Sequence, residues 1–310
     1  MHNFTHGVMF HHFHDELNHS EGQGSISALD FSRILEYVIT KYNLLDPDTY
    51  EDKMINGKLA DNDVVLTFDD ALKSQYEIAF PILEQEGIKA YFFVYTNAFS
   101  VNPDPLEFYR DYRNTAFQSL GDFYEQFFSL FAELLPDLFS KYKSSYPEDY
   151  LALFPFYTEM DRRFRYVRDE ILGQERYFLV MDRLMAGSSY DKSERQKILF
   201  MNEGDLVSLS KSGHSIGLHS SSHPTRIDYK SYDEQLIEYT QNFEFISRLT
   251  GKSPTSMSHP CGRYNSDTLQ ILSNIGMKIG FCSSIYESAS KGCFELPRED
   301  HANLLKFINS

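Results

Sequence analysis

The chain has 310 residues, of which 42% are hydrophobic, and it contains 26 Phe, 21 Tyr and no Trp. This length and composition predict a globular protein with a large core and exclude a disordered chain. The formal net charge of −16 disfavours binding to nucleic acid or to an anionic membrane surface, because both depend on Lys and Arg.

Three further features bear on the protein's location. The sequence has no run of 18 apolar residues, so we expect no membrane span. Its first residues lack the basic and apolar segments of a secretory signal. The three cysteines (Cys261, Cys282 and Cys293) are odd in number and clustered late in the chain, which does not predict a disulfide framework. We therefore expect a cytoplasmic protein.

In the first third of the chain, short apolar segments alternate with segments of helical periodicity. Strands are predicted at residues 7–10, 63–68 and 88–95, and helices from residue 28 and over 71–86. Pro81 is expected to kink the second helix, and Gly87 to end it.

Residues 97–200 have a different pattern, which is dense in aromatic and charged side chains. In the segment 120–142, apolar residues recur at three- and four-residue steps, as in an amphipathic helix. Residues 161–200 also have a helical pattern. We interpret 97–200 as a helical insertion. Its aromatic stripe is expected to be ordinary core; the alternatives are a lid over the site, a homo-oligomer contact or another partner surface.

After residue 200 the alternation resumes. Helices are predicted at 205–211, 232–250 and 266–276, and strands at 215–218 and 279–283. Short strands that alternate with helices favour a parallel α/β sheet or barrel.

Two adjacent carboxylates follow the strand 63–68. The sequence VVLTFDDA places Asp69 and Asp70 where the apolar run ends. For an isolated pair of this kind, exposure to water is the simplest explanation. In a parallel α/β fold, however, the carboxyl ends of the strands gather at one edge, where functional sites form.

A second apolar strand ends in a pair of histidines. His219 and His223 are four residues apart, with small serines between them. A catalytic metal site uses about three protein ligands, and borderline ions such as zinc accept imidazole nitrogen and carboxylate oxygen. Asp70, His219 and His223 would supply that set. Asp69 would then remain as a general base beside an activated water.

These motifs resemble those of the polysaccharide deacetylases of the NodB-homology type, carbohydrate esterase family four. TFDD is present at 67–70, the H-[S/T]-x-x-H-P pattern at 219–224, and P-x-G at 260–262, in the family's order and spacing. The resemblance covers residues 1–97 and 200–300. It implies one domain over 1–310, a distorted (β/α) barrel, with the helical insertion 97–200 inside it.

The resemblance also implies a reaction, the removal of N-acetyl groups from sugars. Asp69 would be the base, and Asp70, His219 and His223 would hold a divalent metal, with zinc the expected ion. The backbone N–H of Cys261 would be an oxyanion donor. Cys261 is not expected to act as a nucleophile, because no triad-like pattern accompanies it.

The sequence departs from the family in its later motifs. The Arg that normally precedes the prolines of the third motif is replaced by Ser258 or His259, and the fourth motif is not found near 279–290. Arg298 could replace the missing Arg, because a guanidinium can hold a carboxylate with two hydrogen bonds. His301 is the expected general acid, with His259 as the competitor; the simpler alternative for Arg298 is a surface salt bridge.

The first strand ends in a cluster of histidines, His11, His12 and His14, followed by Asp15. We expect His11 and His12 to line the pocket and contact substrate, in preference to forming a second metal site with their neighbours.

The expected substrate is an N-acetylated amino sugar, a sugar nucleotide or a glycan precursor, since a cytoplasmic enzyme meets these and not a finished wall; this points to surface-glycan biosynthesis. Two other functions fit the sequence. One is an inactive carbohydrate-binding or scaffold protein of the same fold, and the other is an amidase that acts on a non-sugar amide.

Overall fold

The computed structural model describes residues 6–101, 103–152, 157–284 and 292–309. The chain divides into two compact units. The sheet unit comprises residues 1–104 and 196–310, and the helical unit comprises 105–195. The helical unit lies within the range 97–200 that the sequence assigned to an insertion.

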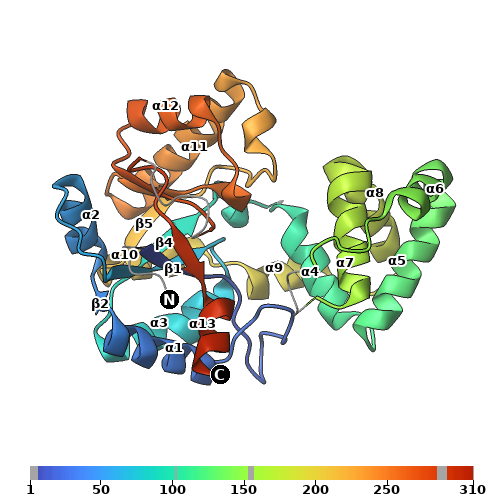
Figure 1. Ribbon diagram of the computed structural model, residues 1–310, viewed down its shortest axis with the longest axis horizontal. Coiled ribbons are helices and arrows are strands. Elements are labelled where there is room, and N and C mark those ends of the chain that lie inside the picture. Colours follow the sequence, from blue (N-terminus) through green and yellow to red (C-terminus); the bar gives the residue numbers. More distant parts are fainter. Residues whose placement is uncertain (1–5, 102, 153–156, 285–291, 310) are drawn as a thin grey trace. The chain divides into compact units, whose positions relative to one another are not determined.

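The sheet unit is built on parallel strands (Figure 1). The strands are β1 (His6–Phe10), β2 (Asn43–Leu44), β3 (Asp63–Asp69), β4 (Tyr91–Val94), β5 (Ser215–Leu218), β6 (Ser256–Ser258), β7 (Ile279–Phe281) and β8 (Arg298–Asp300). Their order is β7-β6-β5-β4-β3-β1-β8, with β2 paired to β3.

The two ends of this sheet approach each other through the segment before β8. Leu296 forms a parallel bridge with Phe281 at the end of β7. Two residues later, β8 pairs with β1, where Arg298 is in register with Gly7. The sheet is therefore a nearly closed, distorted (β/α) barrel, as the sequence predicted.

The apolar strands that the sequence predicted are buried in the barrel. All seven residues of β3 and all five of β1 are buried, which fits parallel strands covered on both faces. The rings of Phe68 and Phe92 stack across β3 and β4 with centroids 4.6 Å apart.

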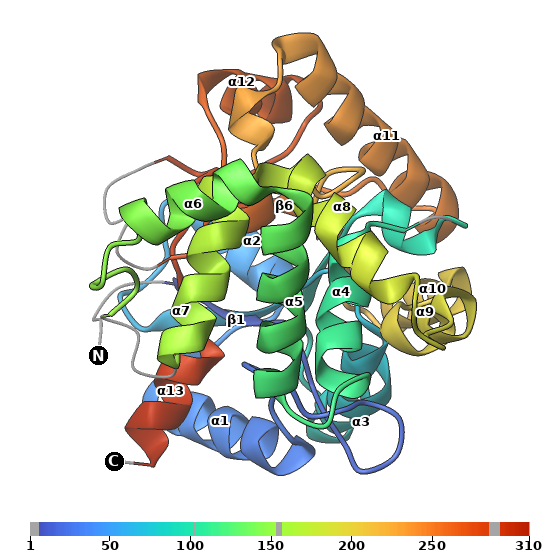
Figure 2. The same cartoon turned by 90° about the vertical axis from the view of Figure 1, so that its right-hand side faces the viewer.

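Helices surround the barrel. They are α1 (Ala28–Lys41), α2 (Pro47–Ile55), α3 (Phe80–Glu86), α9 (Lys192–Leu199), α10 (Glu203–Lys211), α11 (Tyr232–Thr250), α12 (Ser266–Asn274) and α13 (His301–Ile308), of which α9 crosses into the helical unit. Helices α1 and α13 lie side by side (Figure 2). The sequence predicted one helix over 71–86. The structure instead has a π-helical turn, Gln75–Ala79, followed by α3. Gly87 ends α3 in a left-handed conformation, as expected.

The helical unit contains α4 (Pro105–Thr115), α5 (Leu120–Leu134), α6 (Pro136–Ser145), α7 (Glu159–Tyr166), a π-helical turn (Val167–Leu172) and α8 (Gly173–Met185). The helix expected over 120–142 is two helices, because Pro136 begins α6. The stripe residues Phe123, Phe127 and Phe131 are buried. Phe123 and Phe127 contact Phe164 of α7. The stripe is therefore core of this unit. No helix of the described residues is long and apolar enough to cross a membrane.

Candidate active site

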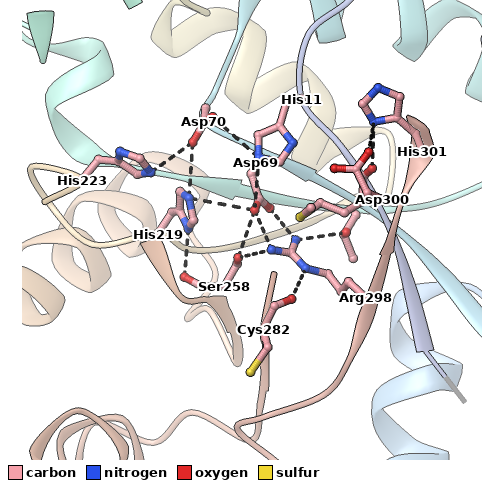
Figure 3. Close-up of polar contacts among 12 residues, drawn as sticks. His11, Asp69, Asp70, His219, His223, Ser258, Cys282, Arg298, Asp300 and His301 are labelled. Carbon is pink, nitrogen blue, oxygen red and sulfur yellow. Dashed lines mark hydrogen bonds and ion pairs between the residues drawn. The ribbon is translucent and has the colours of Figure 1, made fainter. Parts of the chain in front are cut away.

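The two adjacent carboxylates lie at the carboxyl end of β3 and point to different partners (Figure 3). Asp69 is the last residue of β3, and Asp70 follows with a φ of 82°. A non-glycine residue rarely adopts this left-handed backbone, and such strain is concentrated at functional sites. The turn directs Asp69 toward Arg298 and Asp70 toward the two histidines.

Asp70, His219 and His223 come together as the sequence predicted. One possible ligand atom from each residue lies within 4.8 Å of the others. The Oδ1 atom of Asp70 is 3.3 Å from His219 Nε2 and 3.4 Å from His223 Nε2. Among the described residues this is the one cluster of His, Cys, Asp or Glu side chains with such geometry.

The hydrogen bonds around this cluster fit a bound cation. His219 Nδ1 donates to the carbonyl oxygen of Ser258 at 2.8 Å, so the other ring nitrogen, Nε2, faces Asp70. Asp70 Oδ1 is buried and accepts no hydrogen bond. Burial alone would raise the pKa of Asp70, but the charges of His223, His219 and His11 hold it far below its usual value. A buried, ionised oxygen beside two imidazoles is a donor set suited to zinc or a similar divalent ion.

Asp69 is held by Arg298 in a paired geometry. Arg298 Nη1 donates to Asp69 Oδ1 at 2.8 Å and Nη2 to Oδ2 at 2.7 Å. Both side chains are buried. Burial alone would raise the pKa of Asp69, but Arg298, together with His219 and His11, lowers it below its usual value. Asp69 is therefore ionised at neutral pH, as a general base must be.

The guanidinium of Arg298 makes three further hydrogen bonds. Nη2 also donates to Ser258 Oγ at 2.7 Å, Nη1 to Thr67 Oγ1 at 3.2 Å, and Nε to the carbonyl oxygen of Cys282 at 2.7 Å. Ser258 occupies one of the places where the resemblance expected an Arg, and the guanidinium of Arg298 reaches that place from β8. The simpler alternative, a surface salt bridge, is wrong because Arg298 is 1% exposed.

His11 is the histidine of the first strand that reaches the carboxylates. Its Nε2 lies 3.9 Å from Asp69 Oδ2 and 3.9 Å from Asp70 Oδ2, and 29% of its side chain is exposed. His12 lies beside it, with ring centroids 6.3 Å apart. Substrate contact by these two residues stays a prediction.

Sequence reasoning missed Gln75, which ties the ends of β1 and β3 together. Its side-chain amide donates to the carbonyl oxygen of His11 at 2.9 Å and to that of Asp69 at 2.5 Å. Gln75 is fully buried at the start of the π-helical turn. A polar residue within a helical pattern gives no sequence signal for this role.

The structure places His301 and His259 in backbone contacts that do not favour their predicted role as acid. The ring nitrogens of His301 face the carbonyl oxygens of Met9 and Gly24 at 3.2 and 3.1 Å, and in Figure 3 this ring lies away from the histidine pair. His259 donates through Nε2 to the carbonyl oxygen of Phe294 at 2.8 Å. Burial lowers the pKa of His259 to about 3, so this ring is neutral at pH 7 and is not the protonated imidazolium that a general acid requires.

Cys261 lies in the turn Pro260–Gly262 that follows β6, with a left-handed φ of 52°. Its position after a strand of the barrel agrees with a backbone role, and oxyanion stabilisation stays a prediction. His14 and Asp15 do not join a second metal cluster among the residues with described placement. His14 instead contacts Ser25, and Asp15 caps the turn that follows it. Part of the segment searched for the fourth motif, 285–291, lies outside the described residues.

The structure is that of an α/β-barrel protein with a candidate site at the carboxyl ends of its strands. A sequence profile of the family described as polysaccharide deacetylase matches residues 56–114 and 188–280. The profile's gap covers most of the helical unit. The chain belongs to the polysaccharide deacetylase family, as its motifs predicted. A search of curated proteins finds no match.

Solved structures of similar fold cover nearly the whole chain. A Streptococcus pyogenes deacetylase, PplD, in complex with acetate superposes with a TM-score of 0.58 at 17% identity, over 99% of both chains. IcaB from Ammonifex degensii also gives 0.58, at 13% identity, over 99% of this chain and 98% of its own. A de-N-acetylase from Aggregatibacter actinomycetemcomitans gives 0.55 at 16% identity, over 98% of this chain and 99% of its own. At these identities the likeness concerns the fold.

Proposed function

We propose that this protein is a metal-dependent hydrolase that removes the N-acetyl group of an amino sugar. The observation that carries the proposal is the pairing of an ionised, Arg-held Asp69 with the neighbouring cluster of Asp70, His219 and His223. Metal-dependent acyl hydrolysis needs both parts, a cation site and a base beside it.

The residues divide the work as follows. Asp70, His219 and His223 would hold the cation, which when bound supplies Lewis-acid polarisation of the acetamide carbonyl. Asp69 accepts a proton from the attacking water, and the oxygen of that water adds to the carbonyl carbon. Arg298 fixes both carboxylate oxygens and keeps Asp69 ionised.

The reaction also requires a proton for the departing amine. We assign this role to His11, because it is partly exposed and its Nε2 lies 3.9 Å from each carboxylate. It replaces His301, both of whose ring nitrogens face backbone carbonyls, and His259, whose Nε2 donates to one. The C–N bond breaks as the amine takes the proton, and the products are acetate and a free amino sugar.

The substrate class rests on the family and not on a pocket of known shape. We propose an N-acetylated amino sugar in a sugar nucleotide or glycan precursor, in line with the expected cytoplasmic location and a place in surface-glycan synthesis. The name "deacetylase" or "de-N-acetylase" that two of the similar structures carry supports the reaction type.

The deciding experiment measures metal content and acetate release together. Elemental mass spectrometry of the wild type should find about one equivalent of zinc or a similar ion, and His223→Ala should lose it. The wild type should release acetate from oligomers of N-acetylglucosamine or from a nucleotide-linked N-acetyl sugar. Bound metal without acetate release from any N-acetylated sugar would favour the inactive or non-sugar alternatives. Absence of metal after zinc loading would refute the proposal.

A further inference from the structure

The loop that carries both histidines has a strained backbone. It leaves β5 at Leu218 and holds Ser220 at a φ of 64° and His223 at 51°. A non-glycine residue in this left-handed conformation is strained, and it persists only where the surroundings fix it. Within the loop, Ser220 Oγ accepts a hydrogen bond from the His223 backbone N–H at 3.1 Å. The backbone of the two residues between them, Ser221 and Ser222, is held from outside the loop.

Glu238 of α11 provides that support. Its Oε2 accepts from the backbone N–H groups of Ser221 at 3.1 Å and Ser222 at 2.8 Å, and its Oε1 accepts from Ser222 Oγ at 2.6 Å. Consecutive backbone N–H groups that converge in this way form an anion-binding nest. Lys230 Nζ lies 3.8 Å from the same Oε1. Glu238 is 8% exposed, so these contacts are made largely out of water.

Asn242, one helical turn further along α11, fixes the start of the loop. Its Oδ1 accepts from the backbone N–H of His219 at 2.9 Å. Its side-chain amide donates to the carbonyl oxygen of Val94 at 3.0 Å and to Thr96 Oγ1 at 3.1 Å. Residues four apart share one face of a helix, so Glu238 and Asn242 act on the loop from the same side.

We propose that Glu238 is a positioning residue that sets the metal affinity of the site by holding the loop between His219 and His223 in its strained form. The inference rests on the proposed function, because it takes the Asp70, His219 and His223 cluster to be a metal site. The hydrogen bonds of the Glu238 carboxylate go to Ser221 and Ser222 and not to Asp70, His219 or His223. It acts through the backbone of Ser221 and Ser222, so its removal frees the loop to relax and moves the two imidazoles apart.

The test compares the zinc affinity of metal-free proteins by competition with a chromophoric chelator. Glu238→Ala should bind zinc about 10- to 100-fold more weakly than the wild type, which is the usual effect of removing a residue that orients metal ligands. Glu238→Gln keeps one acceptor oxygen for the loop and should recover part of the loss. Glu244→Ala is the matched control, because it removes an exposed acid from the same helix and should leave the affinity unchanged.

Thermal unfolding of each metal-free variant separates positioning from simple stability. The zinc measurement is made well below the unfolding temperature, so a variant that is only less stable keeps the wild-type affinity. If Glu238→Ala does not fold, Glu238→Gln carries the test. Wild-type affinity in both Glu238 variants overturns the inference while leaving the proposed function standing. A wild type that binds no zinc overturns both.

Discussion

Replacing Arg298 by Met should strongly destabilise the fold, because it leaves Asp69 buried without its cation. Asp69 is 2% exposed and would keep only the hydrogen bond from Ser258 Oγ at 3.1 Å. The change removes two charge-assisted hydrogen bonds to Asp69, each worth about 1.5–3 kcal/mol. Breaking a buried ion pair from one side costs about 3–5 kcal/mol, and we expect a loss in this range.

The assay is urea unfolding in the presence of a chelator, so that metal binding does not contribute. The chain has no Trp, and its 21 Tyr or its circular dichroism supplies the signal. With a slope of about 3 kcal/mol per molar urea, the midpoint should fall by about 1–1.7 M. The double variant Asp69→Asn/Arg298→Met removes both charges and should lose less than the sum of the two single losses.

Two results would refute this reasoning. One is an unfolding free energy for Arg298→Met within about 1 kcal/mol of the wild type, because a buried uncompensated carboxylate costs more than that. The other is additivity of the two single changes, because residues in one ion pair couple by about 0.5–3 kcal/mol.

Asp69→Asn should retain zinc by elemental analysis but lose acetate release by at least about 100-fold, as expected for removal of a general base; loss of zinc would contradict the division of roles. His223→Ala should lose both zinc and activity, and normal turnover would exclude a metal site there. Gly217→Ala should cost about 1–3 kcal/mol of stability by overpacking, because the added Cβ would lie 2.5 Å from a Phe93 ring carbon; an unchanged urea midpoint would contradict it. Burial lowers the pKa of His214 to about 4, below its ordinary value of about 6.5. As the pH falls, His214 therefore takes up its proton in the unfolded chain before it does so in the folded one. Between pH 7.5 and 5 this residue should lower the free energy of unfolding of the wild type by about 2 kcal/mol. The free energy of unfolding of His214→Gln should fall by less over the same range, and equal falls would contradict the assignment.

The parts of the site that the sequence predicted are those whose signal is local. The buried strand β3 ends at Asp69 and is followed directly by Asp70, and the serine-spaced histidines follow β5. Each pattern lies within about ten residues, so the strand, its end and the side chains beyond it can be recognised together. The parallel alternation then brings the strand ends to one edge.

The parts that the sequence did not predict depend on contacts across the barrel. Strands β6 and β8 have three residues each, and their sequences, SMS and RED, lack an apolar run. They are strands because neighbouring strands pair with them. The acid role predicted for His301 relied on its place in the sequence, which cannot reveal that both of its ring nitrogens face backbone carbonyls.

The ion pair at the base joins residues 229 positions apart, and this has a consequence for synthesis. At about 5–20 residues per second, a ribosome adds Arg298 roughly 10–50 s after Asp69. Once residue 223 has been added, the growing chain contains Asp70 and the two histidines, but Asp69, a buried carboxylate in the complete fold, still has no Arg298, and β1 has no β8 to pair with. A chain interrupted before β8 would therefore carry Asp70, His219 and His223 without the Arg298 that holds Asp69. If the proposed function is correct, activity depends on docking of this late strand, and we expect a chain that ends before β8 to be inactive.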